Sequence, residues 1–184
     1  AWLDRRFELF ERFCWPSVRA QTRQDFRWLV LFDVKTSAPY RERAASYARR
    51  WPGFVPLFLE DDWESTFPEA VRERLSPGAR HLITSRMDND DAIARHFIQS
   101  VQEAFRGGER EVLQFPRGYV WQAHKLYLFD YPANPFSTMI EPVDGLRTVF
   151  CADHDRLSEV APVRFLTERP SWLQVVHGGN LANR

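Results

Sequence analysis

Residues 81–91 read HLITSRMDNDD, and this stretch decides our expectation for the fold. Its first five residues, HLITS, form a short apolar run of the kind typical of a strand buried in a parallel sheet. Three aspartates then follow within four residues: Asp88, Asp90 and Asp91. Because open α/β sheets bind ligands at the carboxyl ends of their strands, the stretch predicts a strand that delivers acids to a ligand crevice.

A helix is predicted directly after the acids. Apolar residues recur there at helical spacing, and Asp91 stands where an N-cap carboxylate accepts hydrogen bonds from the first helical N–H groups. Two glycines at 107 and 108 are expected to end this helix. Its predicted buried face consists of Ile93, Phe97, Val101 and Phe105.

Upstream of this stretch, helical and strand-like patterns alternate. We expect helices over residues 2–18, 41–50 and 69–75, and strands over residues 26–32 and 54–59. Strands separated by helices favour parallel pairing through right-handed crossovers. The predicted fold class is therefore α/β, with a mostly parallel sheet flanked by helices.

Downstream of residue 110 the pattern changes to short β-rich runs broken by prolines. EVLQFPRGYVW, KLYLFDY and PFSTMIE indicate a mixed or antiparallel extension of the sheet. No internal repeat or low-complexity linker interrupts the chain, so we expect one domain over 1–184. Its first half, 1–108, would bind the ligand, and its β-rich second half, 109–184, would complete the site.

The composition excludes several classes of protein. Lys plus Arg and Asp plus Glu number 25 each, so the chain has no excess positive charge for bulk nucleic-acid binding. No apolar run reaches the roughly 20 residues that a membrane-spanning helix needs. Cys14 and Cys151 match no metal-binding or redox spacing, and they favour a reducing compartment. We therefore expect a cytoplasmic protein, at most peripheral to a membrane.

The acidic stretch suits a hard divalent cation. Asp88 and Asp90 lie two residues apart at a strand end, where both could share one ion with water and with phosphate oxygens of a substrate. An EF-hand loop is excluded, because it needs a glycine and a distal glutamate at fixed offsets. Helix capping alone would explain Asp91, although it leaves the other two acids unexplained.

Several separated motifs resemble those of the rhamnosyltransferase family. They are ELFERFCWPSVRAQTRQDFRWLVLFD (8–33), SRMDNDDAIARHFIQSVQ (85–102), NPFSTMIEP (134–142) and PSWLQVVHGGNLANR (170–184). RMDNDDA is similar to the DXD motif of glycosyltransferases with the GT-A fold. The resemblance implies metal-dependent, inverting transfer of a sugar, with rhamnose as the candidate, from a nucleoside-diphosphate donor to a glycan or polysaccharide acceptor.

The resemblance also implies roles for individual residues. Asp33, Arg86, Asp88 and Asp90 would bind the donor, with Asp33 contacting the nucleoside. The cation, Mn²⁺ or Mg²⁺, would be held by Asp88, Asp90 and the late His177. Two structural alternatives stay open: Asp33 could cap the turn that follows it, and His177 could be an ordinary hydrogen-bonded group.

Inversion needs a base that takes the proton of the acceptor hydroxyl. Glu141, which ends the apolar run FSTMI, is the first candidate, and Asp153 and His154 in CADHD are the reserve. Glu141 could equally be a solvated strand end.

Two other functions compete. A metal-dependent phosphohydrolase would also place paired aspartates at a strand end. A non-catalytic carbohydrate-binding module would use exposed aromatic rings, for which Tyr119 and Trp121 are the candidates, although a core role for them is favoured. The resemblance carries one further expectation: the first strand of the fold lies upstream of Ala1.

Overall fold

The computed structural model describes residues 2–166 and 169–178. The last part of the motif 170–184, from residue 179 onward, lies outside the described residues. The chain forms two compact units: residues 23–77, and residues 1–22 together with 78–184. These units differ from the two halves expected on either side of residue 108. The expectation of one domain over 1–184 stays a prediction.

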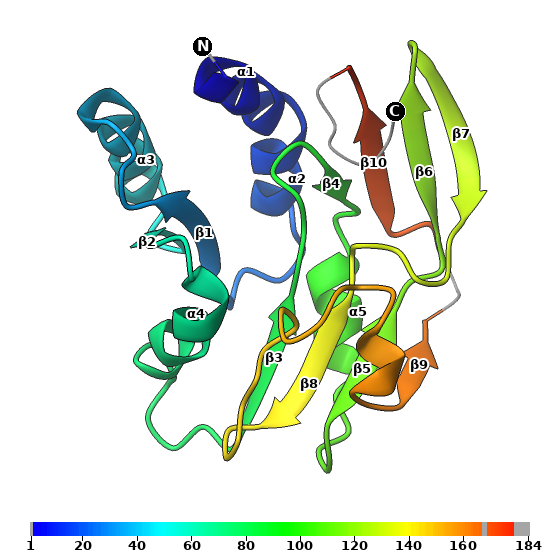
Figure 1. The fold of residues 1–184 in the computed structure, drawn as a ribbon. Helices are drawn as coiled ribbons and strands as arrows, with labels where there is room; N and C mark the ends of the chain where they lie inside the picture. Colours follow the sequence, from blue (N-terminus) through cyan, green and yellow to red (C-terminus); the bar gives the residue numbers. More distant parts are fainter. Residues whose placement is uncertain (1, 167–168, 179–184) are drawn as a thin grey trace. The chain divides into compact units, whose positions relative to one another are not determined.

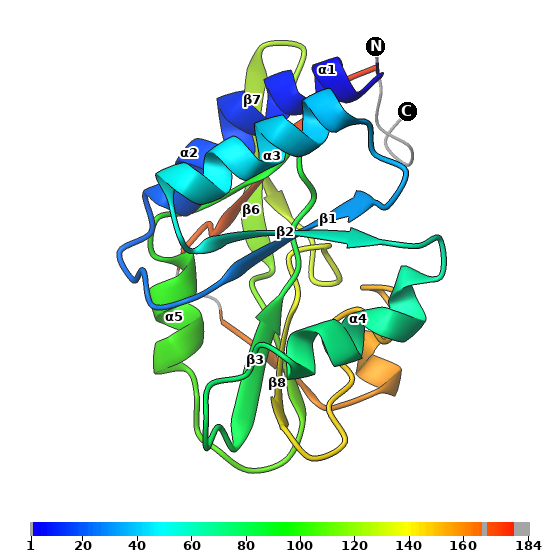
Figure 2. The ribbon, with the colours of Figure 1, turned by 90° about the vertical axis from the view of Figure 1, so that its left-hand side faces the viewer.

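The unit of residues 23–77 is a parallel two-stranded sheet with two helices. β1 (Trp28–Asp33) pairs with β2 (Phe54–Leu59) in register, and α3 (Ala38–Arg50) forms the crossover between them. Figure 2 shows α3 on one side of these strands and α4 (Trp63–Arg72) on the other. The predicted strands and helices are confirmed, but α4 begins six residues earlier than expected.

The larger unit begins with the predicted N-terminal helix, which is continuous but irregular. It consists of α1 (Trp2–Leu9), the π-helical turn η1 (Phe10–Cys14) and α2 (Trp15–Arg19). Pro16 has no N–H to donate, and its ring would clash with the carbonyl four residues before it, so a wider turn lets the helix pass this point. No helix in the described ranges is long and apolar enough to span a membrane.

The larger unit contains two mixed sheets, so the expectation of a mostly parallel sheet is wrong. One has the order β3-β8-β5-β9, in which only β5 and β9 run parallel. The sequence pattern shows that a segment is extended, but the partner is set by contacts distant along the chain. Its strands are β3 (His81–Ser85), β5 (Glu111–Gln114), β8 (Thr138–Pro142) and β9 (Val163–Phe165), with the short 3₁₀ helix η2 (Leu157–Glu159) before β9.

The second sheet has the order β4-β10-β6-β7, and its last three strands lie side by side in Figure 1. Its strands are β4 (Ala92–Ile93), β6 (Arg117–Gln122), β7 (Lys125–Asp130) and β10 (Trp172–Val176). The helix expected from Asp91 onward starts only at Phe97, as α5 (Phe97–Glu103). Residues 92–93 pair instead with the late strand β10, which a local pattern does not reveal.

Gly118 of β6 makes room for the largest side chain of this core. A Cβ atom at this position would lie 2.0 Å from the indole of Trp172. That indole is buried, stacks on Phe136 at 5.2 Å, and donates from Nε1 to the carbonyl of Phe115 at 2.7 Å. The absence of a side chain at Gly118 therefore lets β10 approach β6.

Gly118→Ala is expected to lower the free energy of unfolding by about 1–3 kcal/mol, because the indole would have to leave its packed position. Urea denaturation measures this change. Gly178→Ala is the matched control, since its Cβ would meet nothing within 4 Å. Equal midpoints for the two variants would show that the Trp172 packing tolerates the extra methyl group.

Candidate functional site

Strand β3 delivers the acidic turn, residues 88–91, to one end of its sheet. The strand direction continues past Ser85, because the N–H of Arg86 donates to the carbonyl of Ser137 at 3.0 Å. The chain then turns back, with the N–H of Asp91 donating to the carbonyl of Asp88 at 3.3 Å. The predicted placement of these acids just after a strand is thus what the structure shows.

The three aspartates of the turn converge. Asp88, Asp90 and Asp91 each offer a carboxylate oxygen, and these atoms lie within 4.8 Å of one another. Asp90 and Asp91 are buried, whereas Asp88 is exposed at the edge of the cluster. Desolvation raises the pKa of Asp88, with Arg86 opposing the rise and Asp90 adding to it. Clustered carboxylates of this kind are the donor set of a hard cation.

Asp91 anchors the turn to β10. Its Oδ1 accepts a hydrogen bond from the N–H of Val175 at 2.8 Å, inside the protein. The expectation that Asp91 caps a helix is wrong, because α5 has His96 at its N-cap and no side-chain capping bond. Its carboxyl group instead links the acidic turn to β10, the strand directly before His177.

Burial raises the pKa of Asp91 to about 8, more than the Val175 hydrogen bond lowers it, and Asp90 and Asp88 raise it further. A carboxyl with a higher pKa in the folded chain binds its proton more tightly there. Between about pH 4 and pH 8, rising pH therefore lowers the free energy of unfolding.

Asp91→Asn is expected to remove this pH dependence, because the amide keeps the acceptor oxygen and does not ionise. The free energy of unfolding of Asp91→Asn minus that of the unmodified chain should increase from pH 4 to pH 8, by at most about 1.4 kcal/mol per pH unit. Urea denaturation at several pH values, with a chelator present, measures it. A difference that stays constant across this range would mean that Asp91 is already ionised when folded.

Arg6 of α1 reaches into the acidic turn, a contact that the sequence pattern does not indicate. Its Nη1 lies 2.9 Å from Oδ2 of Asp90, and its Nη2 donates to Oδ1 of Asn89. The guanidinium also lies over the ring of Trp2, 5.7 Å from its centroid. In the sequence, Arg6 is one of several polar residues between the apolar positions of a helix, and nothing in that pattern distinguishes it.

His177 lies beside the acidic turn, as the residue just after β10. Its Nε2 is 2.9 Å from Oδ2 of Asp90, and its side chain is largely buried. Because a carboxylate only accepts, Nε2 carries the proton in this contact. The structure therefore brings His177 to Asp90, in a contact that orients the carboxylate.

Cys14 of η1 packs against the same turn. Its Sγ lies 3.8 Å from the carbonyl oxygen of Asp88, and the residue is buried. Burial, with the nearby carboxylates, holds the pKa of this thiol well above its usual range. Cys14 thus packs as a small apolar residue, as expected from the sequence.

Glu141 is fully buried in β8, and its carboxylate is occupied by three donors. Oε2 accepts from Nε of Arg110 at 2.9 Å and from the N–H of Arg147 at 3.0 Å. Oε1 accepts from the N–H of Thr148 at 2.7 Å. Thr148 has a left-handed backbone conformation, with φ 65°. These contacts make Glu141 the anchor of the loop after β8, a poor arrangement for a base at a site mouth.

The two reserve residues differ in their surroundings. Asp153 is exposed in the loop after β8. His154 is half-buried, and its Nδ1 lies 2.6 Å from the carbonyl oxygen of Ala133. Since that oxygen only accepts, Nδ1 carries the proton and Nε2 of a neutral ring has the lone pair. A protonated His154 would lower the pKa of Asp88, the smallest of the effects on that carboxyl.

Arg86 follows β3 directly and belongs to the same neighbourhood. Its charge lowers the pKa of Asp88, which places its guanidinium near that carboxylate. The guanidinium also lies over the ring of Phe150, 5.2 Å from its centroid. Arg86 thus adds a positive charge beside Asp88 at the end of β3.

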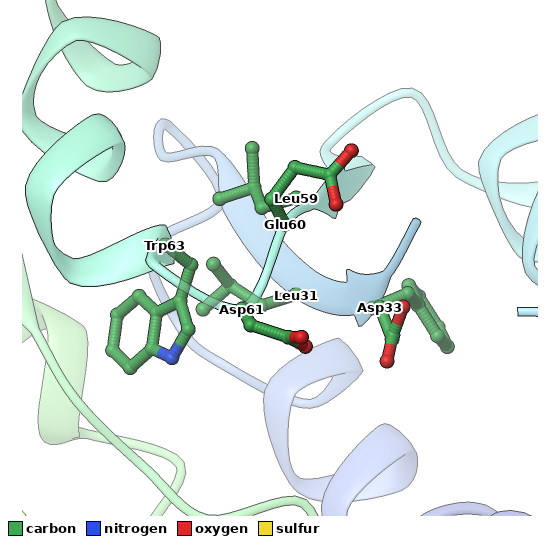
Figure 3. Close-up of a pocket in the computed structure, with 7 residues that line it drawn as sticks. Leu31, Asp33, Leu59, Glu60, Asp61 and Trp63 are labelled. Atoms are coloured by element: carbon green, nitrogen blue, oxygen red, sulfur yellow. The ribbon is translucent and has the colours of Figure 1, made fainter. Parts of the chain in front are cut away.

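Asp33 lies in the other unit, where it lines a pocket of about 340 Å³ at the carboxyl ends of β1 and β2. Figure 3 shows Asp33, Glu60 and Asp61 around this pocket, with the indole of Trp63 beside them. Oδ1 of Asp33 accepts from the N–H of Lys35 at 2.6 Å, so the turn-capping alternative is also realised. The volume is at the lower end of the roughly 300–1,000 Å³ of ligand sites.

The two aromatic rings considered for a carbohydrate-binding module are placed differently from one another. Tyr119 is 37% exposed on β6. Trp121 is half-buried and packs against Phe13 of η1, with ring centroids 5.5 Å apart. They therefore do not form a flat exposed platform of two rings.

The structure is that of a mixed α/β protein in which carboxylates, arginines and histidines lie near the carboxyl end of β3. The chain belongs to the family described as "Putative rhamnosyl transferase", whose model matches residues 1–184, the whole chain. The family name indicates a glycosyltransferase, a class that uses a sugar donor and an acceptor. The comparison with curated proteins found no match.

Proposed function

We propose that this chain is a glycosyltransferase of the GT-A type that binds a divalent cation and a nucleoside-diphosphate sugar at the acidic turn. The convergence of three carboxylates after β3 carries the proposal, together with membership of the family. The transferred sugar is a hexose, with rhamnose the first choice from the family name. The acceptor is a hydroxyl of a glycan.

The donor set of the turn fits Mn²⁺ or Mg²⁺. Carboxylate oxygens are the ligands that hard divalent cations prefer, and Asp88 keeps the solvent access that an incoming ion needs. Asp88 and Asp90 would hold the ion, while His177 orients Asp90 through their 2.9 Å contact. Bound there, the cation would stabilise the negative charge that develops on the leaving diphosphate.

His154 is the base that the geometry favours for an inverting transfer. Its Nδ1–H is fixed on Ala133, which leaves the lone pair on Nε2 to take the proton of the acceptor hydroxyl. Replacing His154 with Gln is expected to lower kcat by about a hundredfold or more, with donor affinity nearly unchanged. An unchanged kcat would remove His154 and leave Asp153.

The pocket at β1 and β2 is the proposed place for the nucleoside. Its carboxylates can accept from the N–H and hydroxyl groups of a nucleoside, and Trp63 offers an aromatic ring. Asp33→Ala should weaken the binding of an uncharged nucleoside, measured by NMR titration. Equal affinity in both proteins would exclude Asp33 from this role.

The activity is tested by incubating the chain with Mn²⁺, a panel of nucleoside-diphosphate sugars and glycan acceptors. Transfer is expected to release nucleoside diphosphate and to add one sugar mass to an acceptor, both measured by mass spectrometry. Release of nucleoside monophosphate together with sugar phosphate, or of inorganic phosphate, without acceptor dependence would instead identify a phosphohydrolase. Glycan binding without turnover of any donor would identify a carbohydrate-binding module.

A further inference from the structure

The guanidinium of Arg6 contacts one of the carboxylates proposed to hold the cation. Its Nη1 lies 2.9 Å from Oδ2 of Asp90, the carboxylate that His177 also contacts. Only 18% of the Arg6 side chain is exposed, so the pair is shielded from most solvent screening. One positive charge thus offsets part of the negative charge of the acidic turn.

A second observation is an unpaired donor on the same side chain. The Nε of Arg6 is buried, and it has no hydrogen-bond partner among the described residues. An unpaired buried N–H of a charged group is costly, and a guanidinium binds phosphate through its Nε and Nη edges. The Nε edge of Arg6 is therefore unsatisfied beside the turn proposed to receive a diphosphate.

We propose that Arg6 is the resident counter-cation of the acidic turn and, once a divalent cation binds, a phosphate ligand of the donor. This inference rests on the proposed function. When the cation neutralises the aspartates, the charge of Arg6 is no longer needed there and repels the ion. A diphosphate restores the balance by accepting from the guanidinium.

The inference predicts opposite effects of one substitution on two affinities. Arg6→Ala should raise the affinity for Mn²⁺ alone by about tenfold or more, because a neighbouring positive charge is removed. The same change should lower the affinity for inorganic pyrophosphate at saturating Mn²⁺ by about tenfold or more. Arg6→Lys should keep the Mn²⁺ affinity near that of the unmodified chain and lower the pyrophosphate affinity, since it keeps the charge and loses the fork.

Electron paramagnetic resonance of Mn²⁺ and calorimetric titration of pyrophosphate measure the two affinities, with thermal unfolding as a check of the fold. Arg5→Ala is the matched control: Arg5 is exposed on the same helix and contacts Glu8 at 3.1 Å. It should change neither affinity. A fall of both affinities in Arg6→Ala, or no change in either, would overturn the inference and leave the metal site standing. Absence of any Mn²⁺ or pyrophosphate binding in the unmodified chain would overturn both.

Discussion

Asp88→Ala is expected to reduce sugar transfer by about a thousandfold or more while the chain stays folded. Asp88 is the one exposed aspartate of the acidic turn, and its side chain makes no hydrogen bond to another described residue. Its removal should therefore cost little stability and relieve repulsion in the cluster. The loss should appear in kcat/KM, because the carboxylate would hold the cation that stabilises the leaving diphosphate.

The matched control is Asp144→Asn, which removes the charge of an exposed carboxylate in the loop after β8. Its activity should equal that of the unmodified chain. Excess chelator should lower the activity of the unmodified chain to that of Asp88→Ala. Added Mn²⁺ should restore the activity of the unmodified chain but not that of Asp88→Ala. Full activity of Asp88→Ala would remove the acidic turn from the reaction.

Glu141→Gln is expected to destabilise the fold by about 3 kcal/mol. The Glu141 carboxylate now accepts hydrogen bonds from Arg110 and from the N–H groups of Arg147 and Thr148. In the Gln variant, the amide NH₂ group would face some of these donors and could not accept from them. Breaking a buried pair leaves an uncompensated buried charge, the main source of this cost. Urea denaturation measures it.

Glu159→Gln is the control, since Glu159 pairs with Arg156 at the surface and its loss should leave the urea midpoint nearly unchanged. The pair of variants separates the two roles considered for Glu141. A catalytic base would leave stability unchanged and lower kcat, and that outcome would contradict the anchoring role.

The sequence predicted the local elements and the acidic turn well, because both depend on short-range patterns. The apolar run 81–85 forms β3, and the three aspartates follow it directly. The contact between His177 and Asp90 lies where the family resemblance placed a late histidine. The metal-binding roles of Asp88 and Asp90, and any role of His177 beside them, remain predictions.

Three features could not be derived, because each depends on contacts between distant residues. The parallel arrangement failed when β8 paired antiparallel with both β3 and β5. Asp91 stands where a helix cap is expected, but its carboxylate accepts a hydrogen bond from the N–H of Val175, which is 84 residues away. Arg6 lies equally far from Asp90 along the chain, and its neighbours in sequence carry no sign of that contact.

The central claim is that the acidic turn holds a divalent cation, and a crystal structure with Mn²⁺ and a nucleoside diphosphate tests it most directly. Anomalous scattering locates Mn²⁺ independently of the protein coordinates. We predict one strong anomalous peak in contact with the carboxylates of Asp88 and Asp90, with a diphosphate oxygen as a further ligand. A peak at another place, or an acidic turn occupied by Arg6 alone at saturating Mn²⁺, would contradict the account.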